Sequence, residues 1–224
     1  MDIKFRQVIY GFFPIVVMML VQNLLVFLGA GALAFFSVMD QQITDPAQLY
    51  NSLAEQVYTS EFNMGISIAY SIVCGVIFFI WYRKVRNTPS HENFAGYRPW
   101  IIPGILMLAV ALQFLTGYIT EVASVAAPAW VAEYEILLSQ VGLTEDSVSI
   151  GLILYTVLLA PIVEELCFRG LTYNYLCRGI SLQAAVVVQA LLFAGFHGNF
   201  FQASYTLVFG LFVGFIYAKS ENIY

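Results

Sequence analysis

The sequence has 224 residues, of which 60% are hydrophobic and 10% are charged, whereas soluble domains carry about 25% charged residues. So few polar side chains cannot cover the surface of a soluble domain, which predicts that lipid surrounds most of the chain. The formal net charge of −5 gives no reason to expect a nucleic-acid partner. We expect a single all-α membrane domain over residues 1–224.

Uncharged runs locate the expected membrane helices, because a helix needs about 20 apolar residues to cross the hydrocarbon core. Three long runs qualify, at residues 7–39, 62–82 and 99–120. A fourth run, 147–163, ends on two glutamates, and the stretch 179–218 contains no acid, lysine or arginine and only His197. That last stretch is long enough for two helices. The sequence therefore predicts a polytopic transmembrane bundle of about six helices.

Basic residues predict the orientation of the bundle, because lysine and arginine stay on the cytoplasmic side. The loops 38–63 and 120–148 contain none of the nine basic residues and nine of the fourteen acids. All nine basic residues fall on one side if the N-terminus is cytoplasmic, which is the orientation we expect. Within the first loop, Thr44-Asp45-Pro46 is typical of a helix start.

Four ionisable residues interrupt the apolar C-terminal half: Glu164, Glu165, Arg169 and His197. Such groups cost at least about 2.5–3.5 kcal/mol each within a span, and therefore mark function by default. Residues four apart share a helical face, so Glu165 and Arg169 are expected to pair, while Glu164 points about 100° away. Glu164 is thus predicted to be free to face a water-filled cavity.

Helical geometry also predicts where these residues meet. Residues 149–178 and 181–197 are expected to form two helices joined at Gly179. Glu164 lies about 16 residues before this turn and His197 about 17 after it, which places both roughly 24–26 Å from the turn. An antiparallel hairpin brings them to one depth, in a site that we expect to open toward the cytoplasm.

A glutamate and a histidine at one depth suggest two kinds of chemistry and one structural alternative. They could activate water directly, or through zinc or another divalent metal held by Glu164 and His197, because carboxylate oxygen and imidazole nitrogen are both good zinc ligands. The alternative is a Glu–His hydrogen bond that only holds two helices together. The residue pattern does not choose among these.

Two motifs in this region resemble a known family. Glu-Glu-x-x-x-Arg at 164–169 and Phe-x-x-x-His at 193–197 are similar to the first two motifs of the CAAX-protease and bacteriocin-processing (CPBP) family, which includes Rce1-like and abortive-infection-type proteins. The segment 209–214, Phe-Gly-Leu-Phe-Val-Gly, resembles the glycine-rich helix that follows in the family, although it could equally be a close-packing helix face. The resemblance covers about residues 147–218.

The resemblance implies an intramembrane endopeptidase and a role for each polar residue. Glu164 would activate water for peptide hydrolysis, with Glu165 and Arg169 in support, and His197 would bind the metal or stabilise the oxyanion. The implied partners are membrane lipid and a membrane-associated protein or peptide substrate. The residues expected to contact substrate are Phe193 and Asn199.

One element of the family pattern is missing from the sequence. The family has a further helix with a His-x-x-x-Asn-type motif, and no such motif follows in residues 215–224. One alternative is therefore a truncated form of an active enzyme, and the other is a catalytically incomplete or inactive relative that acts as a bacteriocin self-immunity or membrane scaffold protein. A small transporter is a weaker alternative, because no inverted repeat is visible. Short loops favour a bacterial cytoplasmic membrane.

Overall fold

A computed structural model describes residues 2–40, 43, 45–85, 101–140 and 149–220. These residues form helices and no strand, as the sequence predicts. The helices are α1 (Ile3–Tyr10), α2 (Phe13–Asp40), α3 (Pro46–Val57), α4 (Ser60–Val85), α5 (Ile101–Ala126), α6 (Pro128–Gln140), α7 (Ile150–Leu154), η2 (Tyr155–Leu159), α8 (Ala160–Glu164), η3 (Glu165–Tyr173), α9 (Asn174–Leu176), α10 (Leu182–Phe196) and α11 (Phe200–Ser220).

Five helical stretches in the described residues are long and apolar enough to cross a membrane. The 15 residues of α10 make a shorter apolar helix, about 22 Å long at 1.5 Å per residue. The expected bundle of about six membrane helices is therefore confirmed, with one member shorter than a full span. The side that the N-terminus faces stays a prediction. The five long stretches are Ile3–Asp40, Ser60–Val85, Leu106–Ala126, Ile150–Leu176 and Phe200–Lys219.

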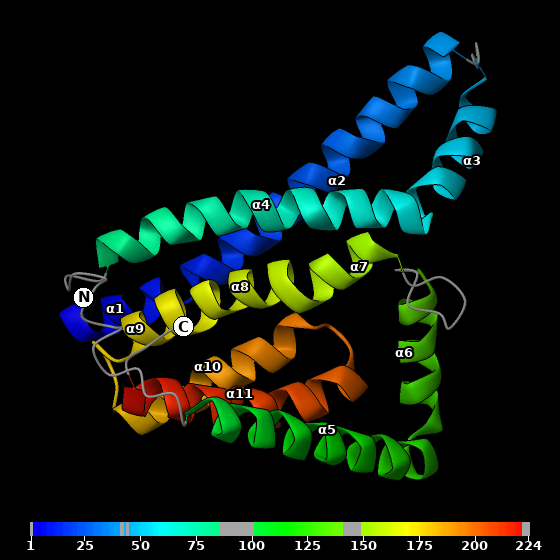
Figure 1. The fold of residues 1–224 in the computed structure, drawn as a ribbon. Helices are drawn as coiled ribbons and strands as arrows, with labels where there is room; N and C mark the ends of the chain where they lie inside the picture. The colour runs from blue at the N-terminus through cyan, green and yellow to red at the C-terminus, as the bar shows by residue number, and fades with distance from the viewer. Residues whose placement is uncertain (1, 41–42, 44, 86–100, 141–148, 221–224) are drawn as a thin grey trace.

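The helical stretch Ile150–Leu176, which runs continuously from α7 to α9, occupies the centre of the bundle. We call it the central span. Figure 1 shows α2 and α4 on one side of the central span, and α10, α11 and α5 on the other. A buried cluster joins the two sides, with Phe78 from α4, Phe168 from η3 and Phe193 from α10 among its members. Residues of the central span can therefore face cavities on either side.

The turn between the central span and α10 brings the two motifs together. It lies at residues 177–181, and the Ser181 hydroxyl oxygen accepts a hydrogen bond from the Ala184 N–H (3.3 Å) at the start of α10. A side chain at Gly179 would collide with the Lys4 backbone carbonyl of α1. The hairpin expected around Gly179 is confirmed.

The two glycines of the 209–214 segment form a packing face against α10. The Gln189 Nε2 donates a hydrogen bond to the Gly210 carbonyl (2.9 Å). A Cβ atom at Gly210 would lie 3.2 Å from both Ala190 and Phe193, and a Cβ atom at Gly214 would overlap the Gln189 amide. Close packing of α10 and α11 therefore leaves little room for a side chain at either position, unless Gln189 or its neighbours shift.

The central span is not the uniform α-helix that the sequence suggested. Two of its segments, η2 and η3, are π-helical, and π-helical turns are rare and often lie at functional sites. Pro161 follows η2 and has no N–H to donate. After η3, the Asn174 Nδ2 donates hydrogen bonds to the carbonyls of Gly170 (2.8 Å) and Arg169 (3.2 Å). Glu164 ends α8 and Glu165 begins η3.

Candidate active site

The expected pair forms between Glu165 and Arg169. Arg169 Nη1 lies 3.1 Å from Glu165 Oε1; the arginine side chain is fully buried and the glutamate side chain is 28% exposed. Burial of an unpaired charge is costly, so each member of the pair stabilises the other in its ionised form. Glu164 is not part of this ion pair.

Phe193 connects the arginine to His197. The Arg169 guanidinium carbon lies 4.6 Å from the centroid of the Phe193 ring, a cation–π contact. The same ring meets the imidazole of His197 at 90°, with centroids 4.9 Å apart. The EExxxR motif and the FxxxH motif are therefore in direct contact through Phe193.

A backbone hydrogen bond determines the tautomer of His197. Its Nδ1 lies 2.9 Å from the Phe193 carbonyl oxygen. A carbonyl oxygen only accepts, so Nδ1 carries the proton, and Nε2 of the neutral ring has a free lone pair. Neutral His197 can thus accept a hydrogen bond or bind a metal through Nε2. It could stabilise an oxyanion by donation only as the charged imidazolium.

Glu164, Glu165, Phe193 and His197 line one cavity of about 510 Å³ between the central span, α5, α10 and α11. The sequence predicted that Glu164 and His197 lie at one depth on neighbouring helices, and the structure brings both to this shared cavity. Arg169 is buried behind it and is not among the lining residues. We call this cavity the histidine cavity.

Asn199 lies apart from the lining of the histidine cavity. It immediately precedes α11, and its Oδ1 accepts a hydrogen bond from the Gln202 N–H (3.0 Å). This is the geometry of a helix N-cap. Its Nδ2 is buried and has no hydrogen-bond partner among the described residues. Its expected contact with substrate stays a prediction.

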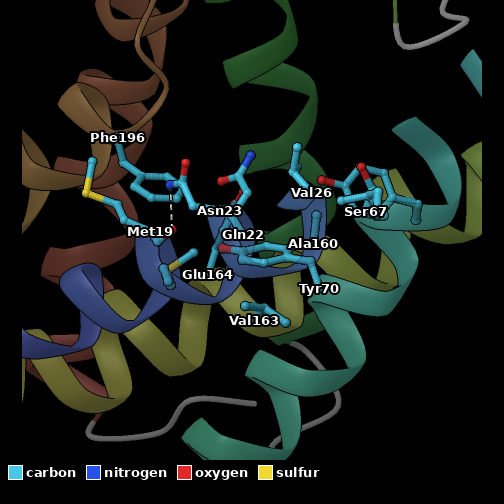
Figure 2. Close-up of a pocket in the computed structure, with 13 residues that line it drawn as sticks. Met19, Gln22, Asn23, Val26, Ser67, Tyr70, Ala160, Val163, Glu164 and Phe196 are labelled. Carbon is cyan, nitrogen blue, oxygen red and sulfur yellow. Dashed lines mark hydrogen bonds between the residues drawn. The ribbon is translucent and has the colours of Figure 1, made fainter. Parts of the chain in front are cut away.

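A second cavity, of about 390 Å³, lies on the opposite side of Glu164, between α2, α4 and the central span (Figure 2). Glu164 lines both cavities. The remaining lining residues of the second cavity are Met18, Met19, Gln22, Asn23, Val26, Ile66, Ser67, Tyr70, Tyr155, Ala160, Val163 and Phe196.

Both cavities extend from Glu164 toward the end of the bundle that carries α3 and α6. The central span lines the cavities only with Glu164, Glu165 and residues that come before them in the sequence. Residues 166–173, which come after them, are buried in the core. Leu166, Phe168 and Leu171 fill the other half of the span with core packing. We expected the site to open toward the side of the basic loops, and the cavities extend the opposite way because that half is filled.

The described part of the chain does not contain a complete set of ligands for the expected metal ion. Catalytic zinc sites generally have three protein ligands. Among the described residues, no group of three or more His, Cys, Asp and Glu side chains is placed to hold a metal ion. Glu164 and His197 supply two donors to the histidine cavity, so zinc or another divalent metal remains a prediction that this geometry does not complete.

Several lining residues were not identified from the sequence. Gln113 and Thr116 of α5, together with Gln202, Tyr205 and Thr206 of α11, line the histidine cavity. The one signal for them was a polar side chain, such as Gln113, in the middle of a long uncharged run. Which face of α5 meets the site depends on tertiary packing.

A family model described as type II CAAX prenyl endopeptidase, Rce1-like, matches residues 146–224. The match confirms the resemblance expected over residues 147–218 and contains the EExxxR and FxxxH motifs. No curated protein and no solved structure matches the chain significantly. The apolar helices and this match together support a multi-pass membrane protein with an Rce1-like C-terminal region.

Proposed function

We propose that this protein is an intramembrane endopeptidase that hydrolyses a peptide bond of a membrane-associated protein or peptide, in CAAX-type or bacteriocin-type processing. One observation carries the proposal: Glu164 and His197 line the same cavity near the middle of the central span. A carboxylate and an imidazole that line the same cavity are a suitable pair for activating water.

The proposed hydrolysis uses the Glu164 carboxylate and the His197 Nε2, which both accept hydrogen bonds from water. Glu164 removes one proton from a water molecule, and Nε2 of neutral His197 accepts a hydrogen bond from the other. The water oxygen then attacks the carbonyl carbon of the scissile peptide bond. When the C–N bond breaks, the leaving amine takes the proton from the Glu164 carboxyl group. The products are a carboxylic acid and an amine, with Glu164 returned to its starting state.

Glu165, Arg169 and Phe193 support this pair. The buried Arg169 holds Glu165 and contacts the Phe193 ring, while Phe193 packs on the His197 imidazole and its carbonyl fixes the Nδ1 proton. Arg169 therefore acts as a positioning residue. The direction of the His197 Nε2 depends on this packed arrangement.

The histidine cavity suits a peptide segment that enters from the bilayer. Its wall combines apolar side chains, including Leu112, Ile119 and Phe209, with the polar side chains of α5 and α11. Such a mixed lining can hold a lipid-attached or hydrophobic peptide while hydrogen-bonding its backbone. We propose a bacterial cytoplasmic membrane as the location and peptide processing as the context.

The test is proteolysis by the full-length protein reconstituted in liposomes. The substrates are a prenylated CAAX-type peptide and an unprenylated membrane-inserted peptide of equal length, and products are identified by mass spectrometry. Wild type should release one defined fragment, and Glu164→Ala and His197→Ala should lower the rate by at least about 100-fold. Equal cleavage by all three proteins would exclude the assigned residues.

A non-enzymatic immunity or scaffold role is the second candidate, and the contacts of Arg169 with Glu165 and Phe193 favour it because they hold the central span against α10. It predicts no cleavage by wild type with either substrate. It also predicts that Glu164→Ala leaves membrane assembly or immunity intact.

A further inference from the structure

We propose that the 390 Å³ cavity is a water chamber that supplies Glu164 with hydrolytic water from the face opposite the histidine cavity. Tyr70 of α4 and Asn23 of α2 are its positioning residues, and Ser67 of α4 is a wall residue that bounds its volume. The supply role rests on the endopeptidase function proposed above. The hydration of the chamber does not, and it can be tested without any substrate.

The first support is the chemical character of the wall. Gln22, Asn23, Ser67, Tyr70 and Tyr155 line the chamber together with Glu164. Gln22 and Asn23 lie near the middle of α2 and are both exposed on the protein surface. Polar side chains at this depth normally face protein or a water-filled cavity, because lipid cannot satisfy their hydrogen bonds. The chamber gives these amides a water-filled space to face.

The second support is a buried hydroxyl whose only hydrogen-bond partner among the described residues is the thiol of Cys74. Tyr70 is 9% exposed, and its hydroxyl has no hydrogen bond to a nitrogen or oxygen atom of the described residues. Figure 2 shows its ring extending from α4 toward Glu164. A thiol is a weak hydrogen-bond partner, so an ordered water in the cavity would give this hydroxyl the stronger hydrogen bond that the protein does not supply.

The third support is the size of the space. A volume of about 390 Å³ has room for on the order of ten water molecules at their usual share of liquid volume. Asn23 is held at the wall by the hydrogen bond from its Nδ2 to the Met19 carbonyl (2.8 Å), drawn as a dashed line in Figure 2. A polar space of this size is expected to contain a connected cluster of water rather than a single molecule.

The position of Glu164 gives the chamber its role. Glu164 lines both cavities, whereas His197 lines only the histidine cavity. A peptide bound beside His197 would displace the water there, yet each hydrolysis consumes one water molecule. The second cavity meets Glu164 from the other side of α8 and stays open while the peptide is bound. Water can therefore be replaced without release of the substrate.

The first experiment measures hydration directly, with a membrane-impermeant thiol reagent on the full chain in liposomes. Ala160→Cys places a thiol in the chamber wall, and Tyr50→Cys on α3 marks the side from which the reagent acts. Leu158→Cys is the control, because Leu158 is 51% exposed, lines neither cavity and lies nearer the same end of the span. Labelling of the wild-type protein measures the background reaction of the native cysteines, Cys74, Cys167 and Cys177.

We expect Ala160→Cys to react at least tenfold faster than Leu158→Cys from the side of α3. A rate equal to that of Leu158→Cys, or reaction from the opposite side only, would overturn the water chamber. This result does not depend on cleavage. Failure of wild type to cleave any substrate would overturn the proposed function alone.

The second experiment tests the supply of water with two variants of Ser67. Ser67→Leu should fill part of the chamber and lower kcat at least tenfold with KM changed less than twofold, because substrate binds in the other cavity. Ser67→Ala, which adds no volume, should change both constants less than twofold. An unchanged kcat in Ser67→Leu, in a protein with the thermal midpoint of wild type, would overturn the supply role.

Discussion

Arg169 and Glu165 form an ion pair across one turn of the π-helical segment η3, with Nη1 and Oε1 3.1 Å apart. The arginine is completely buried and also contacts the Phe193 ring. Arg169 thus links the central span to α10 beside the Phe168–Phe193 ring contact, and the arrangement of the candidate site depends on it.

Removal of the arginine is expected to destabilise the fold. Arg169→Leu leaves Glu165 without its partner, and breaking a buried pair costs about 3–5 kcal/mol. We expect a loss of about 3 kcal/mol, at the lower end of that range, because Glu165 is 28% exposed. Chemical unfolding in detergent measures the change.

The double variant Glu165→Leu/Arg169→Leu is the control for this prediction. It removes both charges and should recover more than half of the loss. If Arg169→Leu alone costs less than about 1 kcal/mol, the pair is not structurally important.

The Phe193 ring is expected to matter for catalysis more than for folding. Phe193→Leu keeps an apolar side chain of similar volume but removes the ring face against Arg169 and the ring beside His197. We expect a destabilisation of about 1–2 kcal/mol from the lost cation–π and packing contacts, and a fall in kcat of at least tenfold. Phe209→Leu, which also changes an aromatic residue of the same cavity, is the matched control and should lower kcat less than threefold.

The glycine face between α10 and α11 predicts a contrast between two substitutions to alanine. A Cβ atom at Gly214 would overlap the Gln189 amide, whereas one at Gly195 would meet no atom within 4 Å. Gly214→Ala should therefore lower stability by about 1–3 kcal/mol through overpacking. Gly195→Ala should raise or preserve stability, because alanine favours the helix. Thermal unfolding in one detergent compares them, and equal midpoints would argue against the tight contact.

The orientation predicted from the basic residues can be tested by labelling cysteines in intact cells. Tyr50 is 73% exposed on α3, and Tyr50→Cys should react with an impermeant reagent added outside. Ser90→Cys, in the basic loop and outside the described residues, should react only after the cells are lysed. The reverse pattern would place the N-terminus outside.

Much of the fold could be predicted from residue spacing. The four-residue interval between Glu165 and Arg169 predicted their pairing, and equal distances from Gly179 predicted that Glu164 and His197 approach each other. Both expectations depend on helix geometry and on one turn, which are local properties of the chain. The cap at Asp45, whose Oδ1 accepts from the Ala47 N–H at the start of α3, is local in the same sense.

The rest depends on contacts between distant segments, which no local pattern encodes. The π-helical turns of η3 arise where the central span packs against α2, α4 and α10, and the sequence alone suggested an α-helix. Gln113 and Asn23 were visible as polar residues in apolar runs, yet their assignment to separate cavities required the packed bundle. The prediction of the direction in which the site opens was wrong. The core side chains of Leu166, Phe168 and Leu171 fill the half of the central span that we expected to be open.

The most direct test of the proposed peptidase is the cleavage rate of Glu164→Gln in liposomes, compared with wild type and with Asp45→Ala. Glutamine keeps the size of the side chain and removes the base, so kcat should fall at least about 100-fold while the thermal midpoint stays within error of wild type. Asp45→Ala, which removes the N-cap of α3 and lines neither cavity, should cost about 1 kcal/mol of stability and leave most of the activity. Cleavage by Glu164→Gln at the wild-type rate would contradict the assignment of Glu164 as the base.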